Sequence, residues 1–169
     1  MKIINSERQV RITDITRITV LTVLVIFLTI AFPVRAESIR DTKVSETQEA
    51  INKELVINFY TAVFTDKKVA QAFKKYATPG YIQHSPLATD VQGTIDFLQA
   101  YLDGTPGHGW ELKRVLADGE LVALHIHSWS GPEDPGRAIV DIFRVEGGRV
   151  AEHWEVIQPV VKMEGRSMF

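Results

Sequence analysis

The chain has 169 residues, a net charge of −2 and 45% hydrophobic residues, which suffices for a single domain with a sizeable core. Its Lys and Arg residues form no cluster dense enough to indicate a nucleic-acid partner. It contains no cysteine, which excludes disulfides, thiol nucleophiles, Cys-ligated zinc and a Cys-anchored lipid but leaves both redox compartments open.

The first 36 residues have the pattern of a secretory signal peptide. Four basic residues precede an uncharged apolar stretch, 18–34, and Val34-Arg35-Ala36 offers a cleavage site before Glu37. An uncleaved signal anchor is the alternative, because the stretch is near the lower limit for a spanning helix. We therefore expect a periplasmic or secreted protein that contacts a membrane only if this segment is retained.

Residues 37–47 are polar and charged and indicate a linker, followed by one domain at 48–160 and a tail at 161–169. Apolar residues at spacings of three and four predict helices over 48–65, 67–76 and 94–102. Between the last two helices, 81–86 is irregular or briefly extended.

Four strands are predicted to follow, at 110–117, 121–129, 138–146 and 149–158. The dipeptides Asp118-Gly119 and Gly147-Gly148 are typical of tight hairpin turns between them. Three helices followed by an antiparallel meander predict an α+β fold with the helices packed on one face of a curved sheet.

Polar side chains within these apolar strands are the candidate functional residues. Asp141 lies among Ile, Val and Phe, where burial disfavours the charged form of a carboxyl, and this suits a general acid or base. The alternative is an Asp paired with Arg or His in a structural network. His125 and His127 share a strand face and could bind a metal, surround an organic substrate, or be held by backbone carbonyls.

The last hairpin predicts which residues share a face. If Gly147 and Gly148 are the turn, Val145 pairs with Val150 and Asp141 pairs with Trp154, unless a β-bulge shifts the register. Asp141, Phe143 and Trp154 then share one face. The other face carries a charged and apolar mixture that we expect at the outer surface or at a dimer interface: Val140, Ile142, Arg144, Ala151, His153, Glu155 and Ile157.

Two further histidines lie in loops. His84 precedes Pro86, in a segment that could open onto a cavity, and is either functional or exposed to solvent. His108 lies in a Gly-rich loop and is expected in solvent. Glu152 and Glu155 are expected to be surface or interface charges.

The segments YIQHSP (81–86), LVALHIH (121–127) and 140–159 resemble the SnoaL-like polyketide cyclases, of the nuclear transport factor 2-like superfamily. The resemblance covers 48–160. It implies a cone-shaped, curved antiparallel sheet wrapped around three N-terminal helices, with a cavity at its open end. It also implies homodimers through the outer sheet face, and no metal or organic cofactor.

In the cyclases an acidic residue on a late strand is the acid/base of an intramolecular aldol closure, and Asp141 resembles that residue. The resemblance extends the catalytic group to His127 and His84. We expect a substrate-binding wall made of His125, Phe143, Trp154, Trp129 and Tyr81.

Three functions remain open at this stage. The first is a cofactor-free lyase, isomerase or cyclase that moves a proton α to a carbonyl, with Asp141 as the base and His127 or His84 on the enolate oxygen. The second is a non-catalytic periplasmic domain that binds a small ligand. The third is a metal-assisted enzyme built on His125 and His127. An apolar cavity with a single acid favours the first, and polar groups that all bond one another favour the second.

Overall fold

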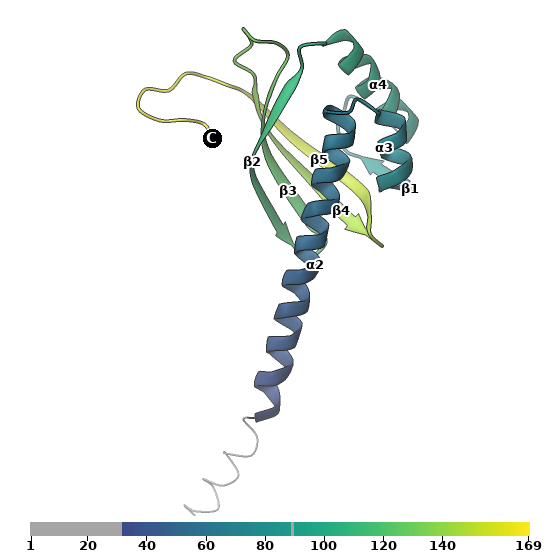
Figure 1. Cartoon of the computed structure of the whole chain (residues 1–169), viewed down its shortest axis with the longest axis vertical. Coiled ribbons are helices and arrows are strands. Elements are labelled where there is room, and N and C mark those ends of the chain that lie inside the picture. Colours follow the sequence, from purple (N-terminus) through teal and green to yellow (C-terminus); the bar gives the residue numbers. More distant parts are fainter. Residues whose placement is uncertain (1–31, 89) are drawn as a thin grey trace, which may run out of the picture. The chain divides into compact units, whose positions relative to one another are not determined.

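The computed structural model describes residues 32–88 and 90–169, with side chains from Ser45 onward (Figure 1). The chain divides into two units after Val44, and the second, Ser45–Phe169, contains the whole sheet. Most of the expected signal segment, residues 1–31, lies outside the described residues. Within the described residues, none of the helices is long and apolar enough to cross a membrane.

The elements follow the predicted order. Three helices, α2 (Phe32–Phe64), α3 (Val69–Tyr76) and α4 (Val91–Gly104), precede four antiparallel strands: β2 (Gly109–Asp118), β3 (Leu121–Trp129), β4 (Arg137–Glu146) and β5 (Arg149–Pro159). The predicted α+β class is confirmed. The helix before the domain starts earlier than expected, because 37–47 contains no Gly or Pro to stop it, and the predicted linker is therefore helical.

An additional strand, β1 (Ala77–Gln83), pairs in parallel with β5, so the sheet is mixed and open, with the order β1-β5-β4-β3-β2. The sequence did not predict its full length, because Pro79-Gly80 interrupts any strand pattern. An edge strand tolerates proline, and the pairing is irregular between Ala77 and Ile82. This strand brings Ile82 and Gln83 beside Glu152 and His153, in the first half of β5.

The helices cover one face of the sheet and form the core with it (Figure 1). Val122, Leu124 and Ile126 alternate along β3 and are fully buried against the helices. The Phe59 ring of α2 packs edge-on against Phe143 of β4, with centroids 6.0 Å apart. The helical face of the sheet is therefore the face on which a cavity can form.

Polar contacts fix two helices against this core. Asn52 of α2 is 2% exposed and donates to the Gly119 carbonyl in the β2–β3 turn at 2.9 Å. At the start of α4 the Asp90 carboxylate accepts the Gly93 N–H at 2.7 Å, which is an N-cap that starts the helix earlier than predicted.

A β-bulge in β5 decides which of its side chains face the helices. Val145 pairs with Val150, as predicted, but the next pair is Arg144 with Glu152, so Ala151 is an extra residue. Beyond it, every partner is displaced by one: Asp141 pairs with Glu155, Ile142 with Trp154, and Phe143 with His153. A one-residue shift inverts the faces of a strand, and the predicted outer position of His153 and inner position of Trp154 are therefore wrong.

Candidate functional site

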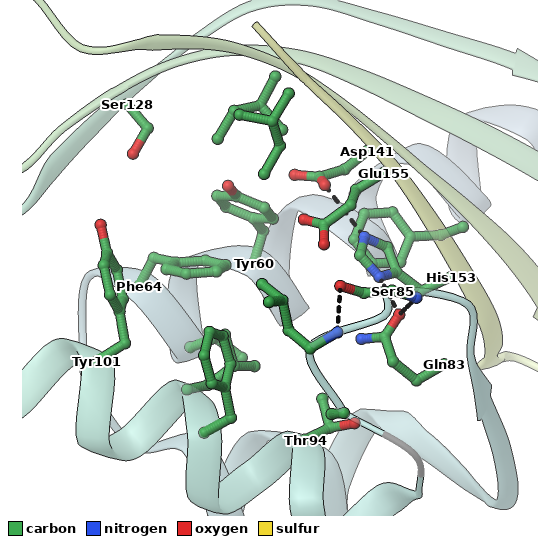
Figure 2. Close-up of a pocket in the computed structure, with 18 of the residues that line it drawn as sticks. Tyr60, Phe64, Gln83, Ser85, Thr94, Tyr101, Ser128, Asp141, His153 and Glu155 are labelled. Carbon is green, nitrogen blue, oxygen red and sulfur yellow. Dashed lines mark hydrogen bonds and ion pairs between the residues drawn. The ribbon is translucent and has the colours of Figure 1, made fainter. Parts of the chain in front are cut away.

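A cavity of about 320 Å³ lies between the helices and the inner face of the sheet (Figure 2). Its volume is at the lower end of the range for small-ligand pockets. Most of its wall is apolar or aromatic, and α2, α4 and β4 contribute most of it. These side chains include Phe59, Val63, Phe64, Phe73, Phe97, Leu98, Ile139 and Phe143.

At one end of the cavity, a carboxyl and an imidazole form a buried pair. Asp141 of β4 is 4% exposed, and its Oδ1 lies 3.1 Å from Nε2 of His153 of β5, which is 8% exposed. Burial of such a pair is costly unless its polar atoms are satisfied. On the far side of the ring, Nδ1 lies 2.8 Å from Oε1 of Gln83 on β1.

The hydrogen bonds of Gln83 indicate which ring nitrogen of His153 carries a hydrogen. The Ser85 N–H donates to Gln83 Oε1 at 3.1 Å, so this atom is an acceptor, and His153 Nδ1 must donate to it. A neutral imidazole has only one N–H. If that hydrogen is on Nδ1, Nε2 has none to donate to the Asp141 carboxylate. One proton is therefore held between Asp141 and His153, on the carboxyl or on the ring.

Two buried tyrosines lie beside this pair. Burial raises the pKa of the Tyr60 phenol well above its usual range, and the charge of Asp141 nearby raises it further. Burial, followed by the charges of Asp141 and Glu155, also raises the pKa of Tyr81 above its usual range. Both tyrosines remain protonated donors. Tyr81 accepts a hydrogen bond from Gln83 Nε2 at 3.4 Å, which leaves its own hydrogen free.

Glu155 is a second carboxylate in the cavity wall, directly across the strand pair from Asp141. It is half-buried and makes no hydrogen bond or ion pair with any other residue whose side chain the structure describes. Figure 2 shows Glu155 beside Asp141 and His153, on the side of the cavity away from Ser128 and Tyr101.

A second polar cluster lines the other end of the cavity. Ser128 of β3 is 3% exposed, and its Oγ lies 3.2 Å from Nε2 of His108. Burial lowers the pKa of His108, and the positive charges of Lys67 and Arg137 lower it further, so this ring is neutral near pH 7. His108 lies between the rings of Phe64 and Tyr101 and is not free in solvent, contrary to the prediction.

Of the residues expected at the site, Asp141, Phe143 and Tyr81 line the cavity. The two histidines of β3 do not. His125 and His127 alternate with the buried residues of β3 and so lie on the outer face. This arrangement has the lower free energy, because burying apolar side chains costs less than burying two imidazoles. His127 Nε2 donates to the Pro135 carbonyl at 2.9 Å, and His125 Nδ1 accepts from Arg114 at 2.9 Å.

His84, Trp154 and Trp129 also lie outside the cavity wall. The His84 ring stacks on Trp154 at 4.7 Å between centroids, and its Nε2 lies 2.8 Å from a Glu152 oxygen. The expectation that Trp154 lines the cavity is wrong because the bulge inverts the faces of β5, and His84 lies outside the cavity because it stacks on Trp154. Trp129 packs against His127 on the outer face, at 5.1 Å between ring centroids.

Sequence reasoning missed most polar residues of the cavity wall, among them Tyr60, Gln83, His108, Ser128, His153 and Glu155. The sequence carried one signal that could have found His153 and Glu155. Val150 and Ala151 are consecutive small apolar residues, and both are buried, which is the pattern of a bulge in an alternating strand. The others depend on contacts between elements far apart in sequence.

The metal-assisted alternative finds no ligand set in the part of the chain that the structure describes. No group of three His, Cys, Asp or Glu side chains there is arranged to hold an ion. His125 and His127 are instead engaged with Arg114 and a backbone carbonyl.

The family of SnoaL-like domains matches residues 56–153, which is more than half of the chain and includes the cavity residues of α2, β1 and β4. The chain belongs to the SnoaL-like domain family. The resemblance inferred from the sequence is thereby confirmed. A comparison with curated proteins gave no match.

Solved structures share the fold of this SnoaL-like domain. AclR from Streptomyces galilaeus, named as a candidate hydroxylase, is 22% identical, with a TM-score of 0.53 over 66% of this chain and 81% of that chain. A candidate polyketide cyclase from Acidithiobacillus ferrooxidans is 19% identical, with a TM-score of 0.52 over 63% and 87%. A nuclear transport factor 2-like protein from Cytophaga hutchinsonii is 15% identical, with a TM-score of 0.52 over 64% and 90%. The nuclear transport factor 2-like fold is confirmed.

The hydrogen bonds of Gln83 give a first prediction. Gln83→Leu keeps the size of the side chain but leaves the Ser85 N–H and His153 Nδ1–H without their acceptor. We expect a loss of roughly 1–3 kcal/mol in the free energy of unfolding for each buried donor left unpaired. Urea denaturation measures it. The control is Gln92→Leu on α4, whose exposed amide bonds only Asp96 and should change stability little. Equal effects of the two substitutions would contradict the assigned role of Gln83.

Proposed function

We propose that this SnoaL-like domain is a cofactor-free enzyme that performs acid–base chemistry, of enolisation or aldol type, on a small carbonyl compound. The observation that carries the proposal is the buried contact between the Asp141 carboxyl and the His153 ring at the wall of an apolar cavity. Low-dielectric surroundings and fixed hydrogen bonds make such a group an effective acid or base.

In the proposed reaction, Asp141 removes the proton from the carbon next to the substrate carbonyl. With His153 protonated, the carboxylate accepts this proton while the imidazolium remains bonded to Oδ1, so no unbalanced charge is buried. The same carboxyl then returns the proton to another atom in an isomerisation, or to the new alkoxide in an aldol closure. Gln83 supports this role by holding the ring of His153 in one orientation.

The developing enolate oxygen needs a hydrogen-bond donor. Tyr81 takes this role in the proposal, since its hydroxyl hydrogen is free and its raised pKa keeps it protonated. Tyr60 also interacts with the charge of Asp141, and in the proposal it helps to position the carboxylate. The sequence-based roles of His127 and His84 are replaced by these residues, because both histidines lie on the outer side.

One of the similar structures supports the reaction class, because it is named as a candidate polyketide cyclase, whereas another is named as a candidate hydroxylase, which is a different reaction. The exported nature expected for this chain makes polyketide closure itself a less suitable assignment than a simpler enolisation.

A non-catalytic ligand-binding domain is the second candidate. One observation favours it: Asp141, His153, Gln83 and Ser85 bond one another, which is also how a structural network is satisfied. The unpartnered carboxylate of Glu155 and the free hydrogen of Tyr81 favour the enzyme.

The substitution Asp141→Asn distinguishes the two candidates. It keeps size and hydrogen-bonding capacity but removes the proton acceptor, so an enzyme should lose ~10²–10⁴-fold in rate. Enolisation can be followed without knowing the natural substrate, by using aryl ketones and 1,3-diketones as test compounds. In heavy water, an enolising enzyme exchanges deuterium into the carbon next to their carbonyl group. Proton NMR measures the exchange rate, and calorimetry measures the melting temperature.

The matched control is Asp118→Asn, at the exposed end of β2, which should change neither quantity. Glu155→Gln should lower the rate less than Asp141→Asn, because no partner holds that carboxylate in position. A destabilised but fully active Asp141→Asn would overturn the mechanism. Wild-type protein that binds these carbonyl compounds and exchanges none of them would establish the binding domain.

We also propose a homodimer through the outer face of β4 and β5. The corrected register changes the residues of this face: Val140, Ile142, Trp154 and Val156 lie there, whereas Ala151 is buried and Ile157 lines the cavity. Val156 is 66% exposed and Val140 is 36% exposed, and the helices α3 and α4 that the structure describes lie on the opposite face of the sheet. A second copy covering the same face by two-fold symmetry would bury both.

Val156→Glu should convert such a dimer to monomers without unfolding it, because this position is exposed in a single copy. Sedimentation velocity at micromolar concentration measures the change. Ile51→Glu on α2, also exposed at 52%, is the control and should leave the dimer intact. A monomeric wild-type protein at this concentration would refute the dimer.

Export is proposed on the sequence of residues 1–36. Cleavage before Glu37 would shorten α2 and leave the unit from Ser45 complete. Intact-mass analysis of protein recovered from its native host should give a chain that starts at Glu37. Membrane-bound protein that retains Met1 would establish the anchor instead.

A further inference from the structure

We propose that the cavity end opposite Asp141 is an anion subsite formed by Arg137, Ser128 and Tyr101, and that the ligand carries a carboxylate there. The ligand class is therefore an elongated apolar molecule with a carboxylate at one end. The other end of this ligand carries the reacting carbonyl, and this one step rests on the proposed function.

The spacing of residues along β4 gives the distance between the two ends of the cavity. Arg137, Ile139, Asp141 and Phe143 alternate on the strand and all line the cavity. Four residues of extended strand span ~13 Å between Arg137 and Asp141. The two charged positions are therefore separated by the apolar middle of the cavity, where Ile139 lies between them.

Arg137 has its charge available. Its guanidinium makes no hydrogen bond or ion pair with the described residues, and its charge acts at longer range on the Asp134 carboxylate and the His108 ring. Asp134, the carboxylate nearby, is already engaged: its oxygens accept the N–H groups of Ser130 and Gly136 at 2.8 and 2.9 Å. A guanidinium without a partner at a cavity wall is suited to binding a carboxylate.

Ser128 supplies a second donor at the same end. It pairs with Arg137 across the β3–β4 ladder, so the two side chains share the inner face. His108 Nε2 contacts its hydroxyl, whereas His108 Nδ1 is buried without a partner. Buried N–H groups are rarely left unpaired, so the hydrogen belongs on Nε2 and is donated to Ser128. The hydroxyl hydrogen of Ser128 is then free to donate into the cavity.

Tyr101 completes the subsite. Figure 2 shows its hydroxyl on the same side of the cavity as Ser128, across from Asp141, Glu155 and His153. The opposite end would repel an anion, because two carboxyl side chains lie there within one cross-strand pair. Attraction at one end and repulsion at the other give a carboxylate-bearing ligand a single orientation.

The test compares 2-naphthylacetate with 2-naphthylacetamide, which have the same bicyclic apolar body and differ in charge. Isothermal titration calorimetry near neutral pH gives both dissociation constants. We expect wild-type protein to bind the acid about five-fold more tightly, a modest factor because Arg137 is exposed. High salt should reduce the preference.

Arg137→Gln should abolish the preference by weakening only the acid, whereas Arg137→Lys should retain part of it. Arg166→Gln in the exposed tail makes the same charge change outside the cavity and should leave both constants unaltered. Ser128→Ala should weaken the acid about two- to three-fold through loss of one donor. Melting temperatures confirm that each variant is folded.

The proposal of the subsite and the proposal of the enzymatic function can be refuted independently. Asp141→Asn should keep the preference for the acid, and strengthen it if anything, even where it abolishes deuterium exchange. Equal binding of acid and amide by wild-type protein would overturn the subsite, as would a preference that survives Arg137→Gln. Failure of the acid to bind at millimolar concentration would also overturn it.

Discussion

The extra residue at Ala151 is the constraint on which the cavity chemistry depends. Without the bulge, β5 would present Trp154 and Glu152 to the helices and place His153 on the outer face. With it, His153 and Glu155 stand opposite Phe143 and Asp141 on the inner face. A single added backbone unit thus supplies both the imidazole that shares a proton with Asp141 and a second carboxylate beside it.

The orientation of His153 depends in turn on an edge strand. Gln83 reaches the ring only because β1 runs parallel to β5, and its amide is fixed by the N–H of Ser85 in the following loop. The pair therefore joins three segments of the chain: β4, β5 and the end of β1. Disturbing any of them changes the position of the shared proton, which links the stability of the sheet edge to the proposed chemistry.

The polar groups on the inner face of the sheet and those on its outer face have different roles. Outside, His127, His125 and His84 are engaged with a carbonyl, an arginine and a glutamate, and they tie loops and strands together. Inside, polar groups gather at the two ends of an apolar cavity. In our proposals, one end moves a proton and repels anions, and the other presents the Arg137 guanidinium to an anion. This polarity gives a bound molecule a direction.

The sequence by itself determined the class of fold, because helical and strand periodicities are local and each hairpin is marked by its own turn residues. It also identified Asp141, Phe143 and Tyr81 as cavity residues, since an acid within an apolar strand stands out from its neighbours. It could not decide the face of His153, Trp154 or the β3 histidines. The facing of a strand follows from register, and one bulged residue inverts it at small local cost. Gln83, Tyr60 and Arg137 became part of the site only when distant segments met across the cavity, which tertiary packing alone decides.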